Sequence, residues 1–151
     1  MNAIDLLKED HDRVDKYFQK VKATDEGEHQ ELFEKIKEEL DVHAHIEEAI
    51  FYPKLIEKGD EELQKITKEG IEEHRQAKMF LRELANLTEN SEKFEPKLKV
   101  LMEDITHHVQ EEEGQMFPMV KEQFNEFDLQ ELGKAMEAEK KNFKKSSSAN
   151  A

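Results

Sequence analysis

The 151-residue sequence contains no cysteine and no tryptophan, and it has only five glycines and three prolines. Without cysteine the chain cannot form a disulfide, a zinc–thiolate site or an iron–sulfur cluster. Few glycines and prolines disfavour an all-β domain, which needs many tight turns. No apolar run approaches about 18 residues, and the N-terminus lacks the basic and apolar stretches of a signal peptide. We therefore expect a cytoplasmic protein with no transmembrane helix.

The chain is strongly acidic, with 37 Asp and Glu residues against 23 Lys and Arg residues and a net charge of −14. Proteins that bind nucleic acids or anionic membranes present basic surfaces to the phosphates, so this balance argues against both partners. Charged residues make up 40% of the chain and hydrophobic residues 36%. Such a composition leans towards disorder unless the few apolar residues are placed so that they form a core.

The apolar residues are placed in this way, because they recur at steps of three and four, the spacing of one helix face. Four stretches of about 20 residues show this pattern, with short connections near residues 24–27, 58–60 and 90–91. The stretches cover residues 4–21, 32–54, 63–84 and 98–119. Four helices with short connections predict an all-α fold, an antiparallel up-down four-helix bundle.

A short additional C-terminal helix is predicted over residues 129–143, with Asp128 as its N-cap. Lysines gather near its end, where positive charge suits the helix dipole. The serine-rich segment 146–151 that follows is expected to be a disordered tail. We therefore assign residues 1–145 to one bundle domain.

An internal repeat divides the sequence into two similar halves. The segment HAHIEEAIFYP, which begins at His43, matches HVQEEEGQMFP, which begins at His108, with an offset of 65 residues (108 − 43). KEDH, ending at His11, similarly matches IEEH, ending at His74, with an offset of 63 (74 − 11). The proline that closes each longer segment lies inside the helical pattern, where proline is expected to kink or end the helix.

In each of the four predicted helices a histidine interrupts the apolar stripe, and in two of them a glutamate follows one turn later on the same face. A single histidine in such a position is usually a hydrogen-bonded core residue. Six titratable groups in one core layer are different, because burying them without a counter-charge is costly. Neutral imidazoles and ionised carboxylates are metal ligands, and a bound metal removes that cost. The candidate metal ligands are His11, His43, Glu47, His74, His108 and Glu112.

The donor set contains nitrogen and oxygen but no sulfur, which favours iron, with manganese or zinc as competitors. Six ligands, two of them carboxylates that can bridge, suit two ions better than one. An oxo or hydroxo bridge between two iron ions would complete the set and leave an open position on each ion. The pattern differs from the carboxylate-rich di-iron sites of ferritin-like proteins, because Glu-x-x-His motifs are missing from the apolar stripes.

These motifs resemble those of the hemerythrin-like family, the HHE cation-binding domains, over roughly residues 3–125. The residues that carry the resemblance are Asp10-His11, His43 to Glu48 with Phe51-Tyr52-Pro53, Glu73-His74, and His107 to Glu113 with Phe117-Pro118. The resemblance implies an up-down bundle around a non-haem, often oxo-bridged di-iron centre held by the six candidate ligands. Where the oxygen carriers of the family have a further histidine, this chain has Lys78. The site therefore looks like the variant with one fewer histidine.

The sequence thus predicts a non-haem di-iron protein that binds or reacts with a small oxidant or gas, namely dioxygen, peroxide or nitric oxide. The missing histidine weakens the case for simple oxygen carriage, and peroxide- or oxygen-reducing enzyme activity stays open. One alternative is a non-catalytic iron or oxygen sensor, or an iron-storage module, whose folding depends on the metal. Another is an interaction bundle with a vestigial site. The sequence does not identify an electron donor or a signalling partner.

Several residues near the candidate ligands have open roles. His107 neighbours His108, but the repeat and the apolar stripe both favour His108 as the ligand. His45 is expected to face solvent or to support a ligand, and His29 to lie on the surface or cap a helix. The residues assigned to solvated faces, of which one could still reach the metal, are Glu48, Glu111 and Glu113. The residues that could complete or support the coordination are Lys78, Tyr17 and Tyr52.

Overall fold

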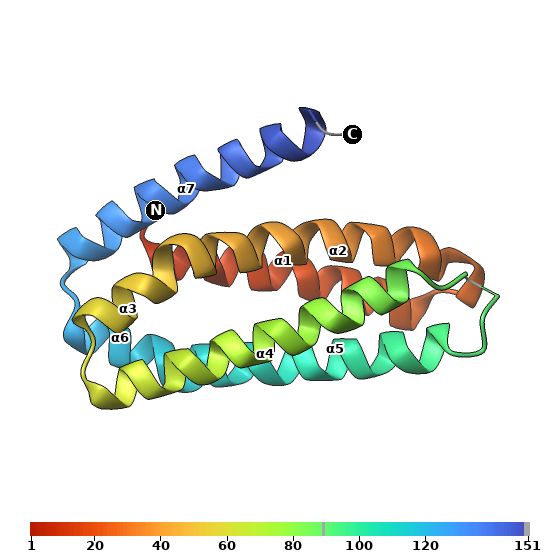
Figure 1. Cartoon of the computed structure of the whole chain (residues 1–151), viewed down its shortest axis with the longest axis horizontal. Helices are drawn as coiled ribbons and strands as arrows, with labels where there is room; N and C mark the ends of the chain where they lie inside the picture. Colours follow the sequence, from red (N-terminus) through yellow and green to blue (C-terminus); the bar gives the residue numbers. More distant parts are fainter. Residues whose placement is uncertain (89, 150–151) are drawn as a thin grey trace.

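The computed structural model describes residues 1–88 and 90–149, and the regular elements of this part of the chain are all helices. They are α1 (Ala3–Ala23), α2 (His29–Ile46), α3 (Tyr52–Lys58), α4 (Glu61–Ala85), α5 (Phe94–Glu111), α6 (Phe117–Gln123) and α7 (Glu126–Ala149). A 3₁₀ turn (Glu26–Glu28) precedes α2, and π-helical turns (Glu47–Phe51 and Glu112–Met116) join α2 to α3 and α5 to α6. The helices form four long rods, namely α1, α2 continued by α3, α4, and α5 continued by α6. These rods alternate in direction, which confirms the predicted antiparallel four-helix bundle (Figure 1). Among the described residues, no helix has the length and apolarity needed to span a membrane.

Polar residues just before α1 and α4 cap the first turns of these helices. Asn2 accepts a hydrogen bond of 2.8 Å from the Asp5 N–H at the start of α1. Asp60 accepts one of 2.9 Å from the Leu63 N–H at the start of α4. Each bond satisfies a backbone donor that has no partner within its own helix.

The C-terminal helix α7 differs from its prediction at both ends. It begins at Glu126, and Asn125 rather than Asp128 provides the cap, accepting a bond of 2.8 Å from the Asp128 N–H. It is 24 residues long and continues to Ala149, so residues 146–149 of the expected disordered tail are helical. Residues 150–151 of that tail lie outside the described residues. The helix is therefore longer than the predicted 129–143.

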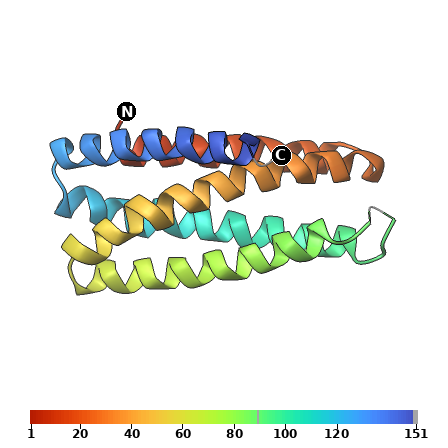
Figure 2. The same ribbon diagram turned by 45° about the horizontal axis from the view of Figure 1, so that its top comes forward.

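Helix α7 lies outside the four-helix bundle, along α1 and α2 (Figure 2). Its close approach to the N-terminus requires a glycine, because a side chain at position 133 would collide with the backbone oxygen of Met1. Leu129, Leu132 and Met136 of α7 are buried in the same apolar cluster as the first turns of α1. Helix α7 thus covers the side of the bundle that α1 and α2 form.

The two long rods that contain Pro53 and Pro118 continue through a π-helical turn instead of ending at the proline. In these wider turns the Tyr52 N–H donates to the Glu47 carbonyl, and the Phe117 N–H donates to the Glu112 carbonyl, five residues back. Each proline then occupies the first turn of the following helix, where its missing N–H costs little. The helix is thus locally widened before each proline and is not interrupted there. Such π turns often occur at functional sites.

Two apolar clusters fill the bundle, one towards each end. The first includes Phe51, Leu55 and Phe117 near the π turns, and the second includes Phe33 and Phe94 near the opposite end. The buried histidines and glutamates of the sequence pattern belong to neither cluster. A polar layer therefore separates two dry regions of the core.

Candidate metal centre

All six candidate ligands come together in the polar layer of the bundle. His11 lies on α1, His43 on α2, His74 on α4 and His108 on α5. Glu47 and Glu112 are the first residues of the two π turns. All six are buried, with exposed fractions between 0% and 8%. The structure therefore brings together every residue that the sequence pattern selected, while their role as metal ligands stays a prediction.

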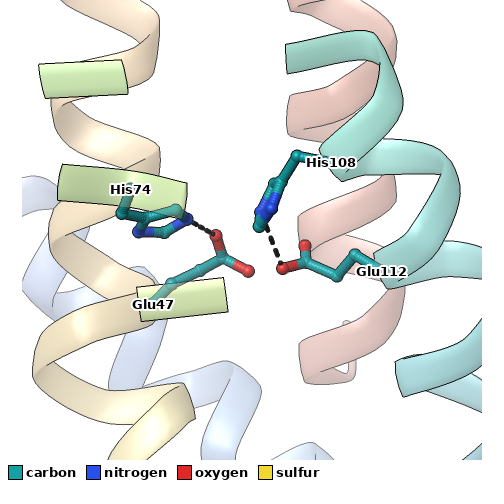
Figure 3. Close-up of side chains that lie close together, drawn as sticks. All are labelled: Glu47, His74, His108 and Glu112. Atoms are coloured by element: carbon teal, nitrogen blue, oxygen red, sulfur yellow. Dashed lines mark ion pairs between the residues drawn. The ribbon is translucent and has the colours of Figure 1, made fainter. Parts of the chain in front are cut away.

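The two glutamates lie between histidines of different halves. The Glu47 Oε1 atom is 3.0 Å from Nε2 of His43 and 3.2 Å from Nε2 of His74. The Glu112 carboxylate approaches Nε2 of His11 at 3.1 Å through Oε1 and Nε2 of His108 at 3.3 Å through Oε2. Figure 3 shows Glu47 with His74 and Glu112 with His108, their polar ends turned towards a common centre. Each carboxylate thus contacts one histidine from the first half of the repeat and one from the second half.

The four histidine rings form two pairs. The ring centres of His11 and His43 are 4.9 Å apart, and those of His74 and His108 are 5.0 Å apart. Ligand atoms within 4.8 Å of one another form two groups, Glu47, His74, His108 and Glu112 in one, and His11, His43 and Glu112 in the other. Two neighbouring positions therefore have convergent nitrogen and oxygen donors.

The central atoms of the cluster approach one another at 3.0–3.3 Å, but their geometry does not make hydrogen bonds. Among the described residues, every buried side-chain nitrogen or oxygen without a partner belongs to this cluster, apart from Oε1 of Gln30. They are Nε2 of His11, His43 and His108, both carboxylate oxygens of Glu47, and Oε1 of Glu112. Such atoms are costly to bury unpaired, and a cation would satisfy them together. A set of imidazole nitrogens and carboxylate oxygens fits divalent iron, manganese or zinc.

The Nδ1 nitrogen of each histidine, on the side of the ring away from the centre of the cluster, is hydrogen-bonded to a carboxylate. In these bonds Nδ1–H donates to the carboxylate, which leaves Nε2 facing the centre of the cluster. The four pairs are His43 with Asp10 (3.0 Å), His108 with Glu73 (2.6 Å), His74 with Glu48 (3.1 Å) and His11 with Glu113 (2.6 Å). Paired carboxylates of this kind orient metal-binding histidines and fix their tautomer.

The prediction that Glu48 and Glu113 belong to solvated faces is wrong. Both are half-buried, and each follows a candidate ligand directly in the sequence. Because one residue turns the helix by about 100°, they point away from the centre and reach a histidine of the neighbouring helix. Their shared offset of 65 residues (113 − 48) in the repeat was the signal that could have identified them. Glu111 instead lies near exposed His107, with 3.1 Å between Oε1 and Nε2.

Cations support two of these carboxylates from the outside. Asp10 accepts hydrogen bonds from Arg13 and from Lys140 of α7. Burial opposes the charge of Asp10, but His43 and Lys140 outweigh it and lower the pKa of Asp10 to about 2. Lys78 donates to Glu48 at 2.6 Å, and with His74 it lowers the pKa of Glu48 to about 2 against the effect of burial. Lys78 therefore supports a histidine-holding carboxylate.

The carboxylates raise the proton affinity of the imidazoles. Burial favours the neutral ring, but Glu47 and Asp10 outweigh it and raise the pKa of His43 to about 10. Burial is likewise overcome at His108, where Glu112 and Glu73 raise the pKa to about 11. Protons thus balance the acidic cluster when no metal does. Metal binding must displace them, since only the neutral imidazole is a ligand.

Of the two tyrosines considered as supporting residues, Tyr52 lies at the cluster and Tyr17 does not. The buried Tyr52 hydroxyl donates to Oε2 of Glu112 at 2.5 Å and lies 3.3 Å from Nε2 of His74. The ring of Tyr17 instead lies under Lys20, with Nζ 5.6 Å from the ring centre. Tyr52 therefore fixes one of the central carboxylates.

The remaining histidines lie outside the cluster. His29 is buried, and its ring donates to the Val21 carbonyl at 2.8 Å and to Glu95 at 2.8 Å. It thus caps the end of α1, as one of its two expected roles required, but it is not a surface residue. His45 contacts α7, where it pairs with Glu139 at 2.8 Å and stacks on Phe143.

Comparisons with known proteins agree with this architecture. The sequence model of the hemerythrin HHE cation binding domain family matches residues 2–120 of this chain. A crystal structure of a hemerythrin HHE cation binding domain-containing protein from Mycobacterium kansasii superposes with a TM-score of 0.81. It is 28% identical to this chain and covers 97% of this chain and 89% of that one.

Two curated relatives are more distant in sequence. An uncharacterized hemerythrin-like protein of Schizosaccharomyces pombe is 25% identical over 138 residues, 91% of this chain and 68% of that protein. A protein of Nostoc sp. named DNA nickase is 26% identical over 125 residues, 80% of this chain. The matched part is 34% of the Nostoc protein, so the present chain spans about a third of its length.

Proposed function

Since this chain belongs to the hemerythrin HHE cation-binding domain family, we propose that it is a non-haem di-iron protein that binds or reacts with dioxygen, peroxide or nitric oxide. The observation that carries the proposal is the group of buried, unpartnered donor atoms at the centre of the polar layer. These atoms all belong to imidazoles and carboxylates, and carboxylates hold the imidazoles in the orientation that metal binding requires.

The arrangement suits two ions rather than one. His11 and His43 would hold one ion, and His74 and His108 the other, because these rings form the two pairs. Glu47 and Glu112 would serve both ions, since each contacts a histidine of either pair. Iron in such a site supplies an exchangeable coordination position and one-electron redox chemistry.

The chain's own residues keep this centre ordered and dry. The four carboxylates that accept from Nδ1 fix the histidine rings, and Tyr52 fixes Glu112 through its hydroxyl. The two apolar clusters above and below the polar layer exclude bulk water along the bundle axis. Charges in such a low-dielectric site interact more strongly than they would in water.

Metal analysis tests the proposal most directly. Protein produced with iron should contain about two irons per chain, and its absorption spectrum should change on adding peroxide or nitric oxide. Well under one iron per chain, or a spectrum that none of the small ligands alters, would contradict it. The variant His107→Ala is a matched control, because it removes an exposed imidazole next to His108 and should keep the metal.

A sensor function is the second candidate, and one contact favours it. Lys140 of α7 donates to Asp10, which in turn accepts from His43, so the C-terminal helix is bonded to a carboxylate of the site. A change in metal state at His43 could therefore change how firmly α7 docks. Slower amide hydrogen exchange in α7 on iron loading, without turnover of any small oxidant, would favour the sensor over the enzyme.

A further inference from the structure

A cavity of about 120 Å³ lies directly beside the candidate metal centre. All four histidines of the cluster line one end of it, whereas Glu47 and Glu112 are not among its lining residues. Most of the other lining residues lie one turn before the histidine on α2 and α5, such as Leu40 and Ile105, or one to two turns after it on α1 and α4, such as Val14 and Leu81. The remaining ones directly adjoin a histidine in the sequence, namely Ala44, Glu73, His107 and Val109. The cavity therefore opens onto the face of the histidine layer opposite the two glutamates.

The walls of this cavity are mainly apolar. They include Val14, Leu40, Ala44, Ala77, Leu81 and Ile105. The two alanines belong to α2 and α4, and each follows the candidate histidine of its helix by one or three residues. A larger side chain at either position would fill the space, so these alanines create the cavity.

The size of the cavity exceeds what the smallest ligands need. One water occupies about 10–15 Å³ on this measure, whereas an apolar cavity of about 150 Å³ holds benzene. Dioxygen, nitric oxide or hydrogen peroxide would fill only a small part of 120 Å³. A compact organic molecule of about six non-hydrogen atoms would fill it well.

The charges around the cavity select among such molecules. Three acidic residues, Asp41, Glu73 and Asp104, line it against one lysine, Lys78. Asp41 is paired with Lys37 and Glu73 with His108, and the Lys78 ammonium group is bonded to Glu48, so these pairs leave the acidic residues in excess. This excess of negative charge disfavours a carboxylate or another organic anion. A neutral ligand with an apolar body is favoured.

We propose that this cavity binds a short-chain alkyl hydroperoxide, with its alkyl body against the apolar walls and its peroxide end at the histidine layer. The inference rests on the proposed function and names a substrate class for the same site. Its reaction breaks the O–O bond and consumes two electrons and two protons, which yields the alcohol and water. Two bound ferrous ions would supply the electrons by becoming ferric, and an external one-electron reductant such as ascorbate would restore them.

A substitution that fills the cavity tests the inference. In Ala77→Leu, the kcat/KM for tert-butyl hydroperoxide relative to that for hydrogen peroxide should fall at least about tenfold, with ascorbate as reductant. The matched control is Ala85→Leu, the same change at an exposed position two turns further along α4, and it should leave the ratio unchanged. An unchanged ratio in Ala77→Leu would overturn the proposal.

A second measurement does not depend on turnover. Xenon applied to crystals of the iron-loaded protein should bind between Ala44 and Ala77 in the wild type and in Ala85→Leu, but not in Ala77→Leu. Iron content should be equal in the three proteins. If Ala77→Leu does not fold, Ala44→Val provides the same test from the opposite wall. A wild-type cavity without xenon overturns the proposal.

The possible results distinguish failure of the alkyl hydroperoxide inference from failure of the proposed function. Reaction with hydrogen peroxide but not with tert-butyl hydroperoxide overturns this inference and leaves the proposed function intact. Failure of both peroxides to react, together with low iron content, overturns both. Reaction with both peroxides, with the selectivity lost in Ala77→Leu, supports both.

Discussion

The two halves of the bundle hold their histidines with the same set of contacts but in different surroundings. In the first half, His43 is held by Asp10, which is 1% exposed and also bonds Arg13 and Lys140. In the second half, His108 is held by Glu73, whose side chain is 35% exposed. Helix α7 packs mainly on α1 and α2, which belong to the first half. The repeat therefore preserves the ligand geometry, while the surroundings of each ligand have diverged.

A second difference lies just beyond the π turns. Tyr52 and Phe117 occupy equivalent positions, 65 residues apart (117 − 52). The Tyr52 hydroxyl donates to Glu112 of the opposite half, whereas Phe117 stacks on His11 with ring centres 6.1 Å apart. Only one of the two central carboxylates thus receives a phenol hydrogen bond from this pair of positions. The two halves of the candidate site are therefore chemically different.

The largest effect is expected from removing a candidate histidine ligand, since both halves contain one at the equivalent position. His43→Ala and His108→Ala should each reduce iron content by at least about half, because each ring would hold one of the two ions. Stability should fall with the metal, since metal binding contributes to folding free energy. Metal analysis and thermal melting of each variant measure this. A variant that keeps both full occupancy and the wild-type melting temperature would remove its histidine from the ligand set.

The next comparison exposes the difference between the halves. Asp10→Asn should weaken metal affinity by about 10–100-fold, as is typical for carboxylates that orient a histidine ligand. Glu73→Gln should weaken affinity by less than about tenfold, because water can reach the half-exposed position and replace the carboxylate. Competition with a chelator measures both affinities. Equal losses would show that burial by α7 has no influence on the site.

Removing the tyrosine hydroxyl should have a smaller effect, on stability. Tyr52→Phe leaves a buried oxygen of Glu112 without its donor, which costs about 1–3 kcal/mol of unfolding free energy. Tyr17→Phe serves as the control, since that ring lies away from the cluster. Urea unfolding of the iron-loaded proteins gives both values. A Tyr52→Phe variant as stable as the control would mean that the phenol hydrogen bond contributes no net stability.

The smallest effect concerns a contact that joins the two halves away from the candidate metal centre. His29 on α2 donates to Glu95 on α5 and to the end of α1. Burial works against the charged ring, but Glu95 and the backbone carbonyls outweigh it, so the pKa of His29 is raised. A raised pKa means that protonated His29 contributes its full stability below the unfolded value of 6.5 and loses it as pH rises through the folded pKa.

The pH dependence of the stability of His29→Gln tests whether the contribution of His29 falls as pH rises. The difference in melting temperature between wild type and variant, both loaded with iron, should be largest below pH 6.5 and shrink towards alkaline pH. Using the loaded protein keeps the cluster histidines from titrating in the same range. A difference that grows with pH would mean that the neutral ring makes these contacts.

The sequence predicted the six candidate ligands because they interrupt a helical stripe, and that pattern depends on spacing alone. It did not predict that Glu48 and Glu113 hold histidines. These residues lie off the stripe, and whether such a position meets a neighbouring helix depends on how the helices cross. Asp10 and Glu73 stand directly before candidate ligands, but their acceptor role needs the same tertiary information. The repeat did contain a usable signal, because both pairs recur at its offsets.

The fold was predicted in outline for a similar reason. Apolar periodicity located four long helices, and short connections implied their antiparallel order. The start of α7 was misplaced because Asn125, and not Asp128, caps its first turn. Residues 144–146 continue the helix although they are exposed, so packing does not explain this extension. The prolines suggested an interruption, but a π turn absorbs it without ending the rod. Local sequence rules do not anticipate that solution.

The π turns also constrain how such chains can change in length. A π turn contains about one residue more than an α turn, so removing one residue inside it would restore ordinary α-helix. Ala49 and Gly114 are such residues, and a side chain at Gly114 would meet open space. The backbone would tolerate either deletion, but everything beyond it would rotate by about 100° relative to the histidine layer. Natural relatives that keep the candidate ligands should therefore keep the length of these five-residue segments.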